Sequence, residues 1–202
     1  MDTITKKMNI HRKNEDSDSE SEDEGGEIMT VVGKEIWYYG DIDRDNVLEF
    51  TKNFKKLERD LMRDAIEDEK PTVKIYICSG GGDVFAGMAV MDTLLKSKLN
   101  VITVAHGECC SAATLFLMGG NIRRVSQNAY ILIHQISTGN FWGKFEDLKD
   151  EMKTCEKLMG LLRNIYNKYT KLPVKKLNKL MKRDIYMDAE ESLKFGVVHG
   201  ID

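Results

Sequence analysis

The chain has 202 residues, of which 42% are hydrophobic and 31% are charged, and its formal net charge is −3. This length fits one domain with a short tail. No basic stripe with interleaved aromatic residues marks a nucleic-acid surface, and no apolar run reaches the roughly 18 residues of a membrane helix. We therefore expect no nucleic acid and no membrane among its partners.

The first 27 residues differ from the rest in composition. Residues 1–27 hold nine acidic and four basic side chains, and residues 14–26 contain no apolar residue. Such a segment cannot bury enough apolar surface to offset the entropy lost on ordering. The composition predicts a disordered acidic tail over residues 1–27 and one folded domain over residues 28–202.

Strand-like and helix-like segments alternate along the folded part. The predicted strands are 28–39, 73–78, 101–105 and 130–133, and the predicted helices are 45–66, 85–95, 111–118, 145–169 and 188–196. This alternation predicts an α/β fold with a mainly parallel sheet.

The helix over 145–169 carries a regular apolar stripe. Its members step by four and three residues and are Leu148, Met152, Cys155, Met159, Leu162, Tyr166 and Tyr169. A stripe of this period faces either the core of its own chain or the surface of another subunit. Both readings stay open at this point.

The four cysteines, Cys78, Cys109, Cys110 and Cys155, have the spacing of neither a metal site nor a disulfide framework. Reduced thiols in a cytoplasmic protein are therefore expected, with no metal and no cofactor.

Ser111 stands where a nucleophile would stand. It follows the strand over 101–105, Gly107 and three further residues, and it opens the small-residue helix over 111–118. A tight strand-to-helix turn projects a hydroxyl beyond the sheet edge, and free N–H groups at a helix start suit a developing oxyanion. Serine is also a favoured N-cap, so a purely structural role is the alternative.

His134 lies where the strand over 130–133 ends, at the carboxyl edge of the sheet where α/β active sites gather. The run Gly80-Gly81-Gly82 follows another strand and reaches the same edge. Glycines let backbone N–H groups approach a substrate closely. Each feature alone is usually structural, but their meeting at one edge favours a catalytic site.

Four segments of the chain resemble, in order, those of the Clp protease proteolytic subunit (ClpP) family of serine peptidases. The segments are CSGGGDVFAGM (78–88), GECCSAATLFLMGG (107–120), YILIHQ (130–135) and RDIYMDAEESLKFGVVHGID (183–202). The resemblance covers about residues 34–202, and parts of it are also similar to phage-encoded members. It implies a ClpP/crotonase-like fold with a long protruding handle-type helix.

The resemblance also implies a function. It points to a serine endopeptidase that hydrolyses unfolded polypeptides inside a homo-oligomeric chamber of two stacked heptameric rings, with an AAA+ Clp ATPase as partner. Ser111 would be the nucleophile, His134 the general base and Asp184 the orienting acid. The backbone N–H groups of Gly82 and Ala112 would form the oxyanion hole.

The acid role and the docking of an ATPase each have a complication in the sequence. Asp188 is a rival for the acid role, but Asp188-x-x-Glu191 is a capping box that already uses its carboxylate. Lys74 and His106 stand where the family has apolar or aromatic residues for docking an ATPase loop, whereas Tyr76 matches that pocket.

Three other functions are alternatives. A catalytically inactive structural ring subunit is disfavoured because Ser111, His134 and Asp184 are all present. A phage head-maturation protease of the same fold is a second alternative. An acyl-CoA enzyme of the crotonase type shares the fold but has no need of the serine–histidine pair.

Overall fold

The computed structural model describes residues 28–66, 69–139 and 143–202, so the predicted acidic tail lies outside the described residues. The strands are β1 (Met29–Val32), β2 (Glu35–Tyr39), β3 (Thr72–Ser79), β4 (Asn100–Cys110), β5 (Ile122–Val125), β6 (Tyr130–Leu132), β7 (Tyr186–Met187) and β8 (Gly200–Ile201). The helices are α1 (Arg44–Asp64), α2 (Val84–Leu95), α3 (Ala112–Met118), α4 (Phe145–Tyr169), α5 (Val174–Leu180) and α6 (Ala189–Lys194).

The strands form one sheet with the order β1-β2-β3-β4-β5-β8, and β6 joins it by pairing with β4 and β7. The pairs β2–β3, β3–β4, β4–β5, β4–β6 and β5–β8 are parallel, whereas β1–β2 and β6–β7 are antiparallel. The expected α/β fold with a mainly parallel sheet is therefore confirmed.

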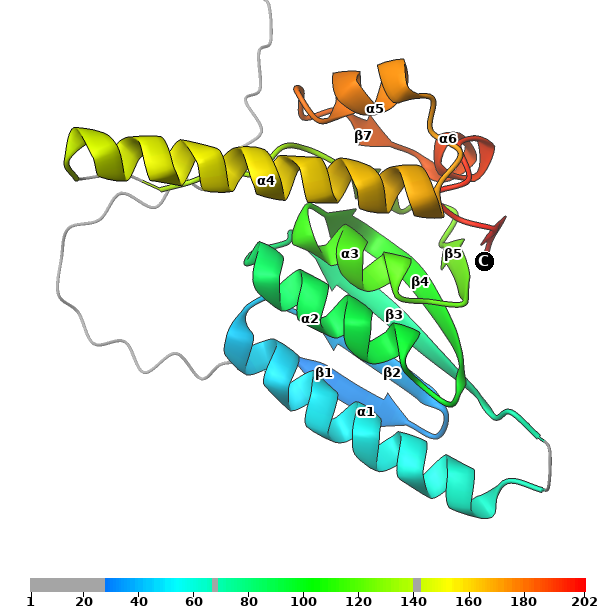
Figure 1. The fold of residues 1–202 in the computed structure, drawn as a ribbon. Helices are drawn as coiled ribbons and strands as arrows, with labels where there is room; N and C mark the ends of the chain where they lie inside the picture. Colours follow the sequence, from blue (N-terminus) through cyan, green and yellow to red (C-terminus); the bar gives the residue numbers. More distant parts are fainter. Residues whose placement is uncertain (1–27, 67–68, 140–142) are drawn as a thin grey trace, which may run out of the picture.

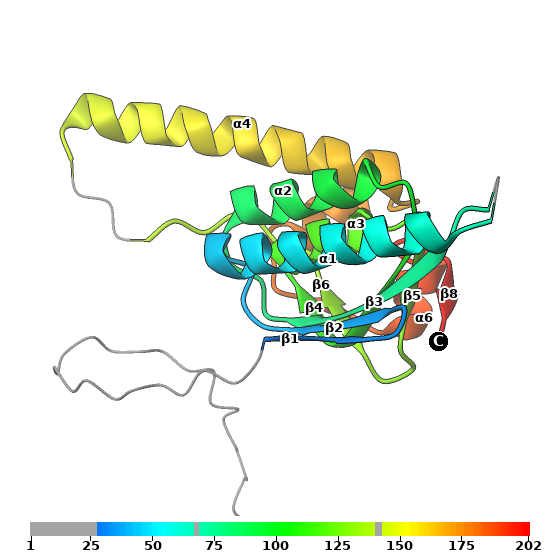
Figure 2. The same cartoon turned by 90° about the horizontal axis from the view of Figure 1, so that it is seen from below.

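Helices α1, α2 and α3 cover one face of this sheet (Figures 1 and 2). The buried side of α1 carries Val47, Phe50 and Phe54, and Phe50 meets Phe116 of α3 with 4.6 Å between ring centroids. The period of 3.6 residues places these side chains on one stripe, and burying that stripe drives the helix onto the sheet.

Strand β4 differs from its prediction in a way that matters for the site. The predicted strand ends at residue 105, whereas β4 continues to Cys110. Its first part pairs with β3 and β5, and after Gly107, at φ +69°, its last residues pair with β6. The predicted strand ends too early because a glycine such as Gly107 is typical of the end of a strand. The extension carries the chain directly to Ser111, beside the end of β6.

The short elements β5, β7, β8 and α5 were not predicted. Each has between two and seven residues. Segments of this length carry too little periodicity to be recognised, and tertiary pairing decides their form. The predicted strand over 28–39 is a hairpin of β1 and β2 that turns at Gly33, with φ +60°.

Helix α4 has the predicted bounds and extends well past the rest of the domain at its N-terminal end (Figure 1). Its two buried residues, Leu162 and Tyr166, lie in the C-terminal half. In the N-terminal half, Leu148 is 42% exposed and Met152 is 59% exposed. The stripe thus faces its own core along only part of the helix.

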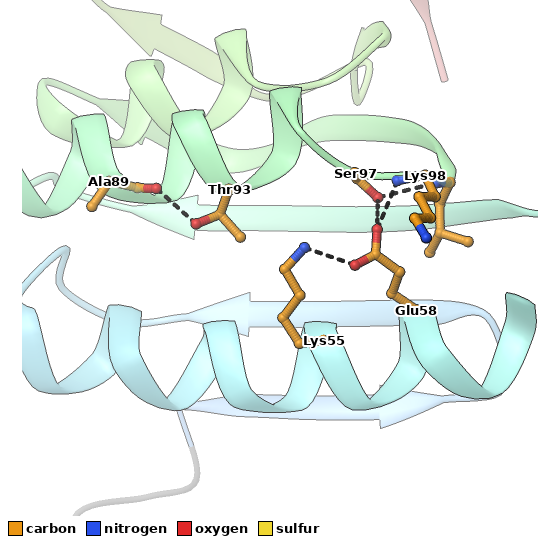
Figure 3. A network of polar contacts seen from close by, with 7 residues as sticks. Lys55, Glu58, Ala89, Thr93, Ser97 and Lys98 are labelled. Atoms are coloured by element: carbon orange, nitrogen blue, oxygen red, sulfur yellow. Dashed lines mark hydrogen bonds and ion pairs between the residues drawn. The ribbon is translucent and has the colours of Figure 1, made fainter.

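A buried carboxylate joins α1 to the turn between α2 and β4 (Figure 3). Glu58 accepts hydrogen bonds from Lys55 Nζ at 2.7 Å, from the Ser97 hydroxyl at 2.6 Å and from the Lys98 backbone N–H at 2.7 Å. Burial alone would raise the pKa of Glu58, but the bonds from Lys55, Ser97 and Lys98 outweigh burial and lower the pKa. The network holds α1 against the layer that supports the site.

In the part of the chain that the structure describes, no helix combines the length and apolar character that a membrane crossing requires.

Candidate active site

Ser111 occupies a strained turn between β4 and α3. Its backbone angles are φ +54° and ψ −123°, and within residues 28–66, 69–139 and 143–202 no other non-glycine residue has positive φ. Such a conformation is unfavourable for an L-residue and persists only where the surroundings hold it. One such restraint is the bond from the Ser111 N–H to the Leu132 carbonyl of β6, at 2.8 Å.

The purely structural role for Ser111 finds no support in the geometry. Ser111 stands at the N-cap position of α3, but its side chain makes no capping hydrogen bond. Ser111 instead lines a cleft of about 260 Å³. Its hydroxyl is therefore available for chemistry in that cleft.

Two glycines pack the turn after β3 closely against its neighbours, Gly81 against Ser111 and Gly82 against Ile42. At Gly81, φ is +107°, and a Cβ atom would lie 2.6 Å from the Cβ of Ser111 and 2.8 Å from the Cys110 carbonyl oxygen. At Gly82, φ is +140°, and the residue forms a parallel bridge with Ile42. Only glycine allows this approach of two backbones.

The expected oxyanion donors reach the same cleft. Gly82 and Ala112 both line the cleft. Among the described residues, neither backbone N–H donates to another backbone group. Ala112 is the first residue of α3, where N–H groups have no partner within the helix. The hydrogen bonds to Ile42 use the Gly81 carbonyl and the Asp83 N–H, so the Gly82 N–H is not used. Two unpaired N–H groups beside a candidate nucleophile suit a carbonyl oxygen that gains negative charge.

His134 follows β6 and lines the cleft with Ser111. Its Nδ1 atom lies 3.5 Å from Oδ1 of Asp184, which precedes β7. This separation is longer than a hydrogen bond, and the Asp184 side chain is 76% exposed. The pairing of β6 with β7 brings the two residues together across a long stretch of sequence.

The rival acid, Asp188, has another role. It is the N-cap of α6 and accepts a hydrogen bond from the Glu191 N–H at 2.8 Å. The predicted capping role of Asp188 is thus confirmed.

The thiols beside Ser111 are poor nucleophiles. Burial, with a smaller contribution from the Glu108 carboxylate, raises the pKa of Cys110 to about 12. Burial also raises the pKa of Cys109 well above its usual range. Because the thiolate is the reactive form of cysteine, these residues stay inert at neutral pH. All four cysteines are free.

Helix α4 forms the wall of the cleft opposite α2 and α3. Leu158, Leu162 and Tyr166 of α4 line the cleft, as do Phe85 of α2 and Leu115 of α3. These apolar side chains share the cleft with polar ones, among them Asp83, Gln135 and Glu151.

Two further residues support the Ser111 turn, Thr114 directly and Tyr166 through Thr114, and the sequence did not predict this role for either. Thr114 Oγ1 donates to the Ser111 carbonyl at 2.6 Å and lies 2.6 Å from the Tyr166 hydroxyl. Thr114 looked like one more residue of a small-residue helix, and Tyr166 like one more member of an apolar stripe. The sequence shows only that each carries a hydroxyl at a position of an apolar face, and this does not predict which group the hydroxyl would meet.

The chain is similar to known proteins of the family that its four segments resemble. A family model described as Clp protease matches residues 37–202. A relative described as "ATP-dependent Clp protease proteolytic subunit", from Deinococcus radiodurans, is 38% identical over 134 residues. That match spans 65% of this chain and 65% of the relative, slightly less than two thirds of its length.

Proposed function

Because this chain belongs to the Clp protease family, we propose that it is a serine endopeptidase with Ser111 as its nucleophile. The observation that carries this proposal is the turn at Ser111, which holds a non-glycine residue at φ +54° with its side chain uncapped in a cleft. Strain of this kind concentrates at functional sites.

The proposed reaction uses the groups around this turn. Ser111 Oγ attacks the scissile carbonyl carbon while His134 removes its proton, and the carbonyl oxygen becomes an oxyanion. Since Nδ1 of His134 faces Asp184, we assign Nε2 as the atom that takes the proton. The protonated imidazole then gives this proton to the leaving amine, and water hydrolyses the acyl-enzyme by the same steps.

The remaining groups stabilise charge. The N–H groups of Gly82 and Ala112 bind the oxyanion, and removal of one such donor usually costs about 10²- to 10³-fold in turnover. The Asp184 carboxylate orients the imidazole and stabilises its positive charge.

The cleft wall points to the substrate class. An unfolded polypeptide can place an apolar side chain against Leu115, Leu158 and Leu162, whereas a folded domain cannot enter a cleft of about 260 Å³. We therefore assign unfolded polypeptides as substrates, cleaved after apolar residues.

Assembly is supported by α4. The exposed apolar residues Leu148 and Met152 lie on the half of the helix that extends past the domain. Exposed apolar side chains at a regular helical spacing suit a contact between subunits. We place this half of α4 between two stacked rings of a homo-oligomer, which encloses the cleft.

The name of the relative from Deinococcus radiodurans includes "ATP-dependent", and we extend this dependence to the present chain through an AAA+ partner. An aromatic cluster on the sheet supports this step. Trp37 and Tyr76 stack with centroids 3.8 Å apart, and His106 lies edge-on to both. Lys74 Nζ lies 4.8 Å above the Tyr76 ring, so Lys74 and His106, which depart from the family's docking residues, border the Trp37–Tyr76 pair that carries this assignment. We assign this cluster as the surface for an apolar ATPase loop.

Labelling with a fluorophosphonate tests the proposed chemistry. The probe reacts with an activated serine, so the full chain should be labelled at Ser111, and Ser111→Ala should not be labelled. The same substitution should lower hydrolysis of a fluorogenic peptide by about 10³-fold or more. An assembled, folded chain that is neither labelled at Ser111 nor able to cleave peptides would contradict the proposal and favour an inactive ring subunit.

A further inference from the structure

A chain of two buried hydroxyl groups connects α4 to the turn that carries Ser111. Thr114 is fully buried on α3, and Tyr166 on α4 is only 2% exposed. The Tyr166 hydroxyl lies 2.6 Å from Thr114 Oγ1, and Thr114 Oγ1 donates to the Ser111 carbonyl oxygen at 2.6 Å.

The direction of these hydrogen bonds is set by counting protons. A carbonyl oxygen can only accept, so the single hydroxyl proton of Thr114 points at Ser111. The Tyr166 hydroxyl must then donate to Thr114. Burial raises the pKa of Tyr166 to about 12, so this hydroxyl keeps its proton at neutral pH. The relay therefore runs from Tyr166 through Thr114 to the Ser111 carbonyl.

The carbonyl that receives this relay belongs to the same peptide unit as the Ala112 N–H. A trans peptide is planar, and its C=O and N–H point in opposite directions. Any rotation of the Ser111 carbonyl therefore turns the Ala112 N–H by the same angle. A hydrogen bond that holds the carbonyl away from the cleft aims the N–H into it.

The peptide unit needs such a restraint. Ser111 is at φ +54°, where an L-residue is strained, and relaxation toward negative φ would rotate this unit. The Thr114 N–H also donates to the Ser111 carbonyl, at 3.0 Å, but this bond lies within the same helical turn. The bond from Tyr166 comes from a separate element and so ties the unit to α4.

We propose that Thr114 and Tyr166 are positioning residues that aim the Ala112 N–H at the oxyanion, so that α4 helps to set the geometry of the oxyanion hole. This inference rests on the proposed peptidase function. Neither side chain is assigned a contact with the reacting atoms, since both act through the Ser111–Ala112 peptide.

The relay predicts a loss of turnover without a loss of substrate affinity. In Tyr166→Phe we expect kcat for a fluorogenic peptide to fall about 10-fold, and in Thr114→Val about 10- to 100-fold, because the donor is misdirected rather than removed. KM should stay within about twofold in both. Thr114→Ser keeps the hydroxyl and should retain most of the turnover.

Two matched controls remove the same atoms elsewhere. Tyr169→Phe deletes a tyrosine hydroxyl on the same helix, three residues from Tyr166. Thr93→Val deletes a hydroxyl that donates to the Ala89 carbonyl of α2 at 2.8 Å (Figure 3). Both should leave kcat close to that of the unmodified chain.

A second measurement separates positioning from loss of stability. A peptide aldehyde forms an adduct with Ser111 whose oxygen occupies the oxyanion hole, whereas the amine-side product peptide has no carbonyl group at the cleaved bond and leaves the hole unfilled. In Tyr166→Phe the affinity for the aldehyde should fall in parallel with kcat, and the affinity for the product peptide should stay constant. Equal losses for both ligands would indicate a merely structural role and would overturn the inference.

The outcomes distinguish a failure of this inference from a failure of the proposed function on which it rests. If the unmodified chain shows neither labelling nor peptide hydrolysis, the proposed function fails and the inference fails with it. If the unmodified chain is active and Tyr166→Phe and Thr114→Val match Tyr169→Phe and Thr93→Val in kcat, the inference alone is wrong. Should Thr114→Val fail to fold, Tyr166→Phe decides.

Discussion

His134 Nδ1 lies 3.5 Å from Asp184 Oδ1, although the two residues are far apart in the sequence. The contact depends on the antiparallel pairing of β6 with β7, which places Leu132 opposite Tyr186. The carboxylate is largely exposed, so its field at the imidazole is screened by water more than that of a buried acid would be.

Replacing this acid should lower turnover moderately. In Asp184→Asn the imidazole loses the group that orients Nδ1, and we expect kcat to fall about 10- to 100-fold, less than the roughly 10⁴-fold effect known for a buried triad acid. Steady-state hydrolysis of a fluorogenic peptide measures the effect. Asp188→Ala is the comparison, since it should cost about 1 kcal/mol of stability through a lost helix cap and change kcat little. The reverse ranking of the two variants would assign the acid role to Asp188.

Gly81 should be intolerant of any side chain. The added methyl group in Gly81→Ala would lie 2.6 Å from the Ser111 Cβ at a backbone φ of +107°. We expect labelling by a fluorophosphonate to slow by about 10²-fold or more and the free energy of unfolding to fall by about 1–3 kcal/mol. Gly80→Ala is the matched control, because its new methyl group would meet its nearest atom, Glu108 Oε1, only at 3.9 Å. Similar labelling rates in both variants would show that the close approach at Gly81 is not required.

Charges on the exposed part of α4 should prevent assembly. The double variant Leu148→Glu with Met152→Glu places two carboxylates at side chains that are 42% and 59% exposed in the single chain. If these side chains form the contact between rings, light scattering should show a smaller particle, and the folded domain should persist by circular dichroism. Lys157→Glu, on the opposite side of the helix and with the same change in net charge, should leave the particle intact. A double variant of unchanged size would place the contact elsewhere.

Glu58 should make stability depend on pH at the acid end. Its folded-state pKa lies below its ordinary value of 4.5, so the unfolded chain takes up a proton first as the pH falls. The stabilisation is fully present above about pH 4.5 and is lost as the pH falls through the lowered pKa. We expect Glu58→Gln to cost about 1–3 kcal/mol at pH 7, measured by urea denaturation. The difference from the unmodified chain should shrink below pH 4.5, and a difference that stays constant down to pH 3 would contradict the assignment.

Much of the framework follows from local patterns in the chain. The period of α4 predicts its bounds because 25 residues give many repeats of one signal. The buried alternation of β3 and the small residues after Ser111 likewise specify a strand and a packed helix without reference to distant partners. Ser111 and His134 could be placed at one sheet edge by the same reasoning, since the ends of parallel strands share an edge.

Tertiary structure alone decided the rest. The extension of β4 to Cys110 needs β6 as a partner, and the nearness of Asp184 to His134 needs β7, which has only two residues. The relay from Tyr166 to Thr114 joins residues whose local patterns describe only apolar helix faces. Local periodicity shows which face of a helix or strand is buried, because a buried face needs apolar residues at regular positions along the whole element. Which hydroxyl meets which carbonyl depends on how separate elements pack, and that information resides in no single segment.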